Sequence, residues 1–234
     1  MNNNNSYAGR RVTVALAGLI AAGSMIVVLA ISGPGEVHAS TDHQHHDGAV
    51  SSAQTGKQLA FHDGMRKLWE EHVTWTRLAI VSFAGNLPDL PFTEQRLLAN
   101  QTDIGNAIKP LYGRVAGDHL TKLLKAHITG AVAILEAAKT GDTARLAHAK
   151  AAWYTNANQI SDFLSAANPH NWPDATMRAM MKTHLNQTLN EAVDQLTGHY
   201  RAGIREYDAI EHHILDMADT LSSGIVKQFP SRFS

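Results

Sequence analysis

The chain has 234 residues, enough for one large domain or two small ones. Its 20 basic and 21 acidic side chains nearly cancel, so it lacks the positive charge typical of nucleic-acid-binding proteins. The absence of cysteine excludes disulfides and thiolate-bound metals, whereas histidine is abundant, with 14 residues. Ala, Leu, Met and Gln are common, and the alternating pattern of strands is scarce. The composition predicts an all-α protein with no nucleic-acid partner.

The first 39 residues have the features of a targeting segment. Arg10 and Arg11 precede an apolar run over residues 12–31, and residues 37–39 (Val-His-Ala) resemble a site that signal peptidase cleaves. The run is also just long enough to span a bilayer. We therefore predict that residues 1–39 are a cleaved signal peptide or an uncleaved N-terminal membrane anchor. Either one would export the rest of the chain to the cell envelope or beyond.

Residues 40–60 are predicted to be a disordered linker, because Ser, Thr, Gln, His and Gly dominate them. Three histidines, His43, His45 and His46, lie close together in this segment, between two aspartates. Neutral imidazoles near carboxylates bind Cu, Ni or Zn. The tract is therefore either an auxiliary metal-capturing tail or a solvated spacer.

From about residue 61 the apolar residues recur with the period of a helix. Proline, glycine and capping residues divide this region into six predicted helices, over residues 62–84, 93–108, 118–141, 142–167, 174–198 and 200–226. The loops are short, so successive long helices should pack antiparallel. We expect one bundle domain over residues 61–229, with five long helices and one shorter helix (93–108), followed by a C-terminal tail (230–234).

Two of the predicted helices carry a similar stretch with a histidine near its end. Residues 123–128 (Leu-Leu-Lys-Ala-His-Ile) correspond to residues 180–185 (Met-Met-Lys-Thr-His-Leu), so His127 and His184 hold equivalent places. Such a repeat is consistent with an internal duplication of a helical unit. We keep duplication as a hypothesis.

Five long helices each place one polar side chain at mid-length on the apolar face. These side chains belong to His72, His127, Asn156, His184 and Glu211. In an antiparallel bundle the helix midpoints lie at similar depth, so the five should converge on one buried layer. Buried imidazoles need partners, and the chemistry of this layer is therefore the main functional signal.

The layer has three interpretations. In the first, it binds a single transition-metal ion (Zn, Cu, Fe or Mn) through His72, His127, His184 and Glu211. Hydrogen-bond partners that fix the imidazole tautomers would then be Asn156, Asp103 and Tyr207. In the second, it is a metal-free hydrogen-bond network that specifies helix register. In the third, Glu211 and a histidine share a proton as an acid–base pair.

Two further side chains are expected outside this layer. Arg77 lies off the apolar stripe of its helix and should form a salt bridge at the bundle surface. His213 is expected on the outer face of the last helix, where substitution should have little effect on stability.

Some resemblances to known proteins limit these interpretations. Ferritin-like di-iron bundles use paired Glu-x-x-His motifs, which the chain lacks, and each predicted core helix supplies one ligand-type residue. A mononuclear site is therefore favoured. Residues 68–77, 153–158 and 224–230 (Leu-Trp-Glu-Glu-His-Val-Thr-Trp-Thr-Arg, Trp-Tyr-Thr-Asn-Ala-Asn and Gly-Ile-Val-Lys-Gln-Phe-Pro) resemble a family of exported helical-bundle proteins of Gram-positive bacteria.

That resemblance implies export and a helical bundle, without a mechanism. Members of the family sometimes carry transferase- or kinase-type labels, but the chain has no phosphate-binding loop and no dinucleotide fingerprint. No catalytic residue is predicted. We expect an exported protein that stores, delivers or senses a transition metal; the alternative is a structural or interaction module with a metal-free polar layer.

Overall fold

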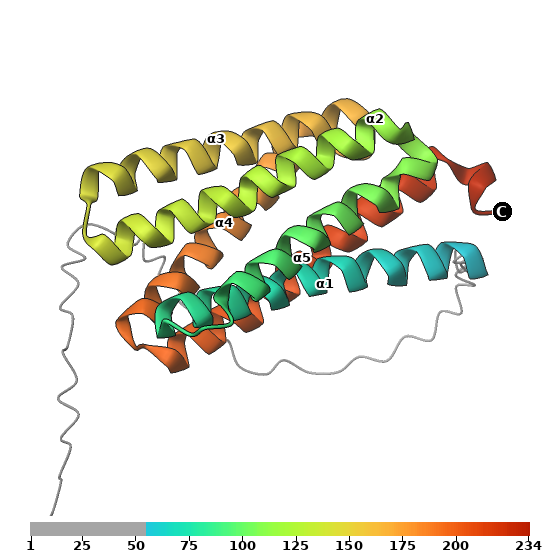
Figure 1. The fold of residues 1–234 in the computed structure, drawn as a ribbon. Helices are drawn as coiled ribbons and strands as arrows, with labels where there is room; N and C mark the ends of the chain where they lie inside the picture. The colour runs from blue at the N-terminus through green and yellow to red at the C-terminus, as the bar shows by residue number, and fades with distance from the viewer. Residues whose placement is uncertain (1–54) are drawn as a thin grey trace, which may run out of the picture.

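A computed structural model describes residues 55–234 as helices joined by short loops (Figure 1). The elements are α1 (Gly56–Gly85), α2 (Leu90–Thr140), α3 (Thr143–Ala167), α4 (Asp174–Thr197), α5 (Tyr200–Gln228) and the short 3-10 helix η1 (Pro230–Arg232). No strand occurs in this part of the chain. The predicted all-α bundle is therefore confirmed.

Several sequence features lie outside the described residues. These include the predicted targeting segment, residues 1–39, and the histidine tract with His43, His45 and His46. Within residues 55–234, no helix is both long enough and apolar enough to cross a membrane.

The bundle domain extends beyond both of its predicted ends, residues 61 and 229. Helix α1 begins at Gly56, so residues 56–60 are helical and do not belong to a disordered linker. Thr55 and Gln58 form a capping box that fixes this start, because each side chain binds the backbone N–H of the other residue. The C-terminal tail also belongs to the fold, since Phe233 is buried against Phe61 with ring centroids 5.1 Å apart.

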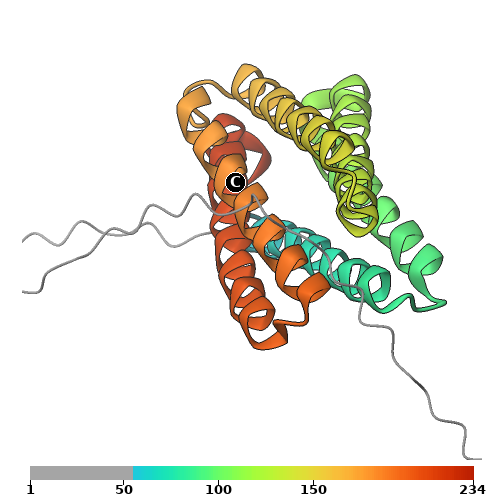
Figure 2. The same ribbon diagram turned by 90° about the vertical axis from the view of Figure 1, so that its left-hand side faces the viewer.

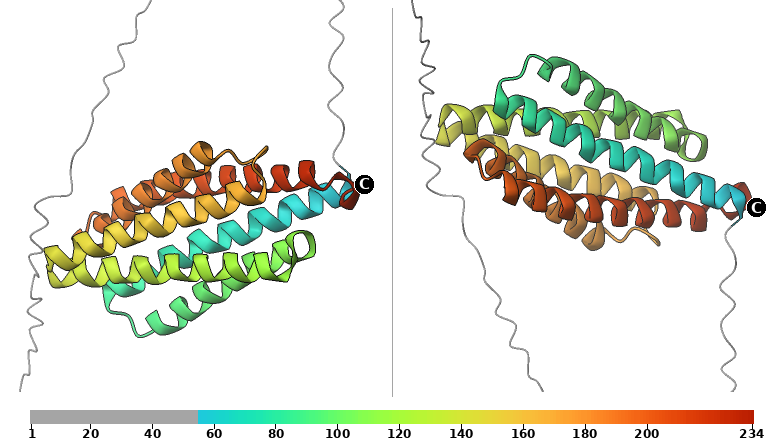
Figure 3. Two further views of the ribbon diagram at one scale, coloured as in Figure 1. Left: turned by 90° about the horizontal axis from the view of Figure 1, so that it is seen from above. Right: turned by 90° about the horizontal axis from the view of Figure 1, so that it is seen from below.

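The predicted helices 93–108 and 118–141 are the two limbs of α2. Residues 90–112 form the first limb, and residues 114–140 form the second limb. At Gly113 the backbone has φ 86° and ψ 165°, a conformation that favours glycine, and the helix folds back on itself there (Figure 3). The limbs touch through their backbones, because a Cβ on Gly105 would lie only 2.6 Å from Gly117 O.

The hairpin in α2 determines the direction of every later helix. Helix α1, the second limb of α2 and α4 run one way, whereas the first limb of α2, α3 and α5 run the other way (Figure 1). Figure 2 shows α2 beside α3 on one side of the molecule and α4 beside α5 on the other, and α1 packs against both α2 and α5. The three helices that carry His72, His127 and His184 are thus parallel to one another.

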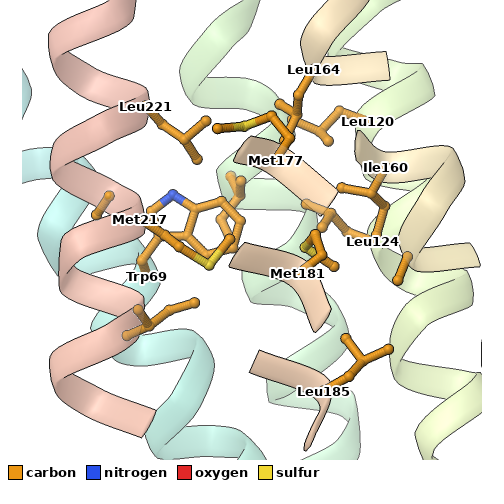
Figure 4. Close-up of a cluster of buried hydrophobic side chains, with 14 of the residues drawn as sticks. Trp69, Leu120, Leu124, Ile160, Leu164, Met177, Met181, Leu185, Met217 and Leu221 are labelled. Atoms are coloured by element: carbon orange, nitrogen blue, oxygen red, sulfur yellow. The ribbon is translucent and has the colours of Figure 1, made fainter. Parts of the chain in front are cut away.

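All five helices contribute side chains to the main apolar core (Figure 4). Trp69 of α1 and Met217 of α5 lie opposite Met181 of α4, and leucine and isoleucine side chains of α2 and α3 close the cluster. On the histidine-bearing helices, Trp69, Leu124 and Met181 precede the histidine, whereas Ile134 and Leu189 of the same core follow it. The apolar core therefore packs on both sides of the polar layer.

Candidate functional site

The structure brings three of the predicted site residues together from three parallel helices. His72 of α1, His127 of α2 and His184 of α4 are almost completely buried, with 3–4 % of each residue exposed. The ring centroids of His72 and His184 are 5.7 Å apart, and those of His127 and His184 are 6.0 Å apart. Trp153 stacks on His127 with a centroid distance of 5.0 Å, and Trp69 meets His72 edge-on at 5.8 Å. The three imidazoles therefore form a compact group within aromatic walls.

Burial keeps these imidazoles neutral. Loss of hydration lowers the pKa of His72 to about 3, and the nearby His127 contributes to this shift. It also lowers the pKa of His127 to about 4, although the hydrogen bond to Asn156 opposes the shift. Burial and the neighbouring histidines lower the pKa of His184 well below its usual range. At neutral pH each ring therefore carries a lone pair on one nitrogen and a proton on the other.

The tautomer of His127 follows from its contact with Asn156. The Asn156 amide donates from Nδ2 to Leu123 O at 3.1 Å, which turns its Oδ1 toward His127 Nδ1, also at 3.1 Å. Because this oxygen only accepts hydrogen bonds, Nδ1 of His127 carries the proton and Nε2 keeps the lone pair. Asn156 therefore has the contact with His127 that the predicted role requires, and the role itself stays a prediction.

His72 has the opposite tautomer because it faces an amide donor. Gln101 Nε2 lies 3.2 Å from His72 Nδ1, and the same nitrogen donates to Leu97 O at 2.9 Å and to Asn100 Oδ1 at 3.0 Å. An amide nitrogen facing Nδ1 excludes a proton there, so the proton lies on Nε2 of His72. The sequence analysis missed Gln101, although its position one helical turn after the buried Leu97 signals an inward-facing amide.

Three polar atoms near the layer have no partner within the described residues. They are Nδ1 of His184, Oε1 of Gln101 and Nε1 of Trp69, and all three are buried. Leaving a buried polar atom unpaired costs about 1–3 kcal/mol, so such atoms are exceptions that need an explanation. The polar layer thus has unused capacity to bind another group.

The other three predicted site residues are not hydrogen-bonded to this layer. Glu211 is half-buried on α5, and the side chain of Asp103 is 49 % exposed and lies 3.7 Å from Arg96. The Tyr207 hydroxyl lies 3.2 Å from Thr74 Oγ1. Within residues 55–234, no group of three or more His, Cys, Asp or Glu side chains already has the arrangement of a metal site.

Among residues 55–234, the carboxylate that is fully buried is Glu191, which lies on α4 two turns after His184 and is 1 % exposed. Its Oε1 accepts a hydrogen bond from Arg77 Nη1 at 2.6 Å. Burial raises the pKa of Glu191 to about 7, against the opposing effect of Arg77. The expected salt bridge of Arg77 therefore exists, but its partner is buried rather than at the bundle surface.

His213 also differs from its expected position. It is half-buried, and its Nε2 lies 2.9 Å from Met180 O, which ties α5 to α4. This contact to a backbone carbonyl of a neighbouring helix contradicts the expectation that the side chain lies free on the outer face.

Comparison with known proteins gives no match. No family model matches the chain, and no curated protein or solved structure matches it either. Membership of the exported helical-bundle family therefore stays a prediction.

Proposed function

We propose that this protein binds one transition-metal ion through His72, His127 and His184. The spacing of the imidazoles is the observation that supports this function best. A metal–nitrogen bond of about 2.0–2.1 Å places the ring centroid roughly 3.2 Å from the ion, so two rings on one ion have centroids roughly 5–5.5 Å apart. The observed separations of 5.7 and 6.0 Å exceed this range by only a few tenths of an ångström.

The chemistry of the donors favours zinc or copper. Neutral imidazole nitrogens suit both ions, whereas iron and manganese sites usually add carboxylates. Glu211 is not needed in this proposal. A three-histidine site keeps a fourth coordination position for water or another small ligand.

His127 and His72 differ in whether Nε2 carries a lone pair, which a metal requires, or a proton. Asn156 leaves the Nε2 lone pair of His127 free, which is the state required of a ligand. His72 has to move its proton from Nε2 to Nδ1 before Nε2 can bind metal. If the Gln101 amide turned over, its Oε1, which now lacks a partner, would accept that Nδ1 proton.

The second candidate function is a structural module whose polar layer sets the register of the helices without metal. The Gln101 amide supports this alternative, because its hydrogen bonds to Leu97 O and Asn100 Oδ1 would be lost if it turned over. Under either function we propose that the domain acts after export, because residues 1–39 have the features of a targeting segment. Its task with a metal would be storage, delivery or sensing.

A stability measurement distinguishes the two functions. A metal ion present at one hundred times its Kd stabilises the folded state by about 2.7 kcal/mol, or roughly 5–11 °C in Tm for a domain of this size. We expect Zn²⁺ or Cu²⁺ to raise the Tm of a chain whose His43, His45 and His46 are replaced by alanine. A chelator should reverse the shift. The same Tm with metal and with chelator would favour the metal-free network.

A further inference from the structure

The helices repeat one arrangement three times. Each core histidine lies on the first helix of an antiparallel hairpin: α1 with the first limb of α2, the second limb of α2 with α3, and α4 with α5. Residues at matching distances from the histidine are buried in all three hairpins. Three residues before it lie Trp69, Leu124 and Met181, which Figure 4 shows in one cluster, and one residue after it lie Val73, Ile128 and Leu185. The domain therefore contains three equivalent hairpins, whereas the repeat in the sequence indicates two.

The returning helix of each hairpin donates a hydrogen bond to the same place on the histidine-bearing helix. The donors are Asn100 Nδ2, Asn156 Nδ2 and His213 Nε2, and the acceptors are the carbonyls of Leu68, Leu123 and Met180, at 3.0, 3.1 and 2.9 Å. Each acceptor lies four residues before the histidine, and donor and acceptor are 32, 33 and 33 residues apart in the sequence. Asn100, Asn156 and His213 therefore occupy equivalent positions.

In the first two hairpins, the contacts of the asparagine oxygen decide the state of the histidine. The oxygen of Asn156 accepts from Nδ1 of His127, which leaves the lone pair on Nε2. The oxygen of Asn100 instead accepts from Gln101 Nε2, and that nitrogen faces Nδ1 of His72. The second hairpin thus holds its histidine in the tautomer that a metal ligand needs, and the first hairpin holds the opposite tautomer.

The third hairpin carries a histidine in place of the asparagine and leaves its core histidine without a fixed tautomer. Nε2 of His213 donates to Met180 O, and an imidazole has no oxygen that could accept from Nδ1 of His184. Within residues 55–234, this buried Nδ1 has no hydrogen-bond partner. The residue at position 213 thus accounts for one of the unpaired atoms of the polar layer.

We propose that position 213 sets the metal affinity of the site, and that His213 keeps this affinity low by leaving the tautomer of His184 unfixed. This inference rests on the proposed metal-binding function. Groups that hold the free N–H of a metal-bound histidine typically raise metal affinity about 10- to 100-fold, and His184 lacks such a group. His213 is therefore a positioning residue. The site suits an ion that has to be released again, as in delivery or sensing.

The test replaces His213 by asparagine, the residue at the equivalent position of the other two hairpins. In His213→Asn, the amide should donate to Met180 O and accept from Nδ1 of His184. We expect ¹⁵N NMR of the metal-free variant to show His184 as the Nδ1–H tautomer alone, which the unchanged protein should not show. Zn²⁺ affinity should rise about tenfold or more, measured with the three histidines of residues 43–46 replaced by alanine. The matched control His212→Asn, at the exposed neighbouring position, should change neither quantity.

The reverse exchange keeps the test decisive if His213→Asn does not fold. Asn156→His gives the second hairpin the residue of the third, so it should release the tautomer of His127 and lower Zn²⁺ affinity about 10- to 100-fold. Equal tautomers and affinities in the exchanged and unchanged chains would overturn this inference and leave the metal site standing. A tautomer change in chains that take up no Zn²⁺ would overturn the proposed function, and with it the claim about affinity.

Discussion

Oδ1 of Asn156 lies 3.1 Å from Nδ1 of His127, and the same amide is held by the backbone carbonyl of Leu123. One asparagine thus decides which nitrogen of a buried histidine carries the proton. This relationship joins α2 to α3 and leaves the other nitrogen of the ring available to a metal or another donor.

Replacing Asn156 by alanine removes this control. We expect Asn156→Ala to lower the free energy of unfolding by about 1–3 kcal/mol, because the Nδ1–H of His127 loses its buried partner. Metal affinity should also fall, by about 10- to 100-fold. Urea denaturation and a zinc titration measure the two effects. Asn158→Ala, at an exposed position on the same helix, should change neither quantity.

The neutral histidines predict a characteristic pH dependence. Their folded-state pKa values, about 3 for His72 and about 4 for His127, lie below the unfolded value of 6.5. The unfolded chain therefore binds more protons between these values, so stability falls as the pH drops from about 6.5 toward 4. Each of these two histidines contributes on the order of a few kcal/mol once the fall is complete.

Glu191 changes stability with pH in the direction opposite to that of the histidines. Its folded pKa of about 7 lies above the ordinary value of 4.5, so its contribution to stability decreases as the pH rises from 4.5 to 7. Three histidines outweigh one glutamate, and we expect a net loss of stability toward acid pH. Urea denaturation at pH 4.5, 5.5 and 6.5 measures it. The loss should persist in His148→Ala, an exposed control, and shrink in His127→Gln; an equal loss in both would contradict this assignment.

The Arg77–Glu191 pair predicts a second dependence on pH. Arg77→Ala leaves a buried carboxylate without its cation, which costs about 3–5 kcal/mol while Glu191 is charged. The cost should be larger at pH 8 than at pH 6, where protonation of Glu191 relieves it. As a control, Arg145→Ala removes an exposed pair with Glu136 and should cost about 1 kcal/mol or less at both pH values. A pH-independent cost for Arg77→Ala would show that Glu191 does not titrate in this range.

The contact between the limbs of α2 predicts a strong effect of one methyl group. A Cβ on Gly105 would lie 2.6 Å from Gly117 O, and backbone on both sides prevents easy relief. We expect Gly105→Ala to destabilise the fold by about 1–3 kcal/mol or more. Gly64→Ala, with open space around the new methyl group, should instead be neutral or stabilising by up to about 1 kcal/mol. Thermal denaturation of both variants compares these effects, and equal Tm values would argue against close contact of the limbs.

Both the helices and the level of the three histidines within the bundle could be predicted from the sequence, because both follow from the periodicity of apolar residues and the short loops. Apolar periodicity fixes which face of a helix is buried, and short loops fix the relative depth of helix midpoints, so His72, His127 and His184 could be placed in one layer. The fold of α2 was less accessible: the sequence predicts that Pro110 and Gly113 together stop the helix over residues 93–108, whereas Pro110 lies inside the first limb and the turn comes at Gly113. A proline inside the last turn of a helix and a proline just after the end of a helix give similar local sequence patterns. The sequence alone therefore does not show on which side of Pro110 the helix ends.

The polar partners were harder to predict because they depend on contacts between helices. Glu211 and Glu191 both lie on long helices, but only Glu191 is fully buried, opposite an arginine more than a hundred residues earlier in the chain. Helical periodicity contains no information about such a pairing. Gln101 was not predicted for a similar reason, since its role depends on where His72 lies on the neighbouring helix.

The metal content of the purified protein tests the central claim most directly. We would measure it by elemental analysis after equilibration with Zn²⁺ or Cu²⁺, in a chain with His43, His45 and His46 replaced by alanine and no affinity tag. We predict about one ion per chain. The ion should be lost in the His127→Ala/His184→Ala variant and retained in His148→Ala. A folded chain without metal, or one whose metal persists in the double variant, would contradict a metal site in the histidine layer.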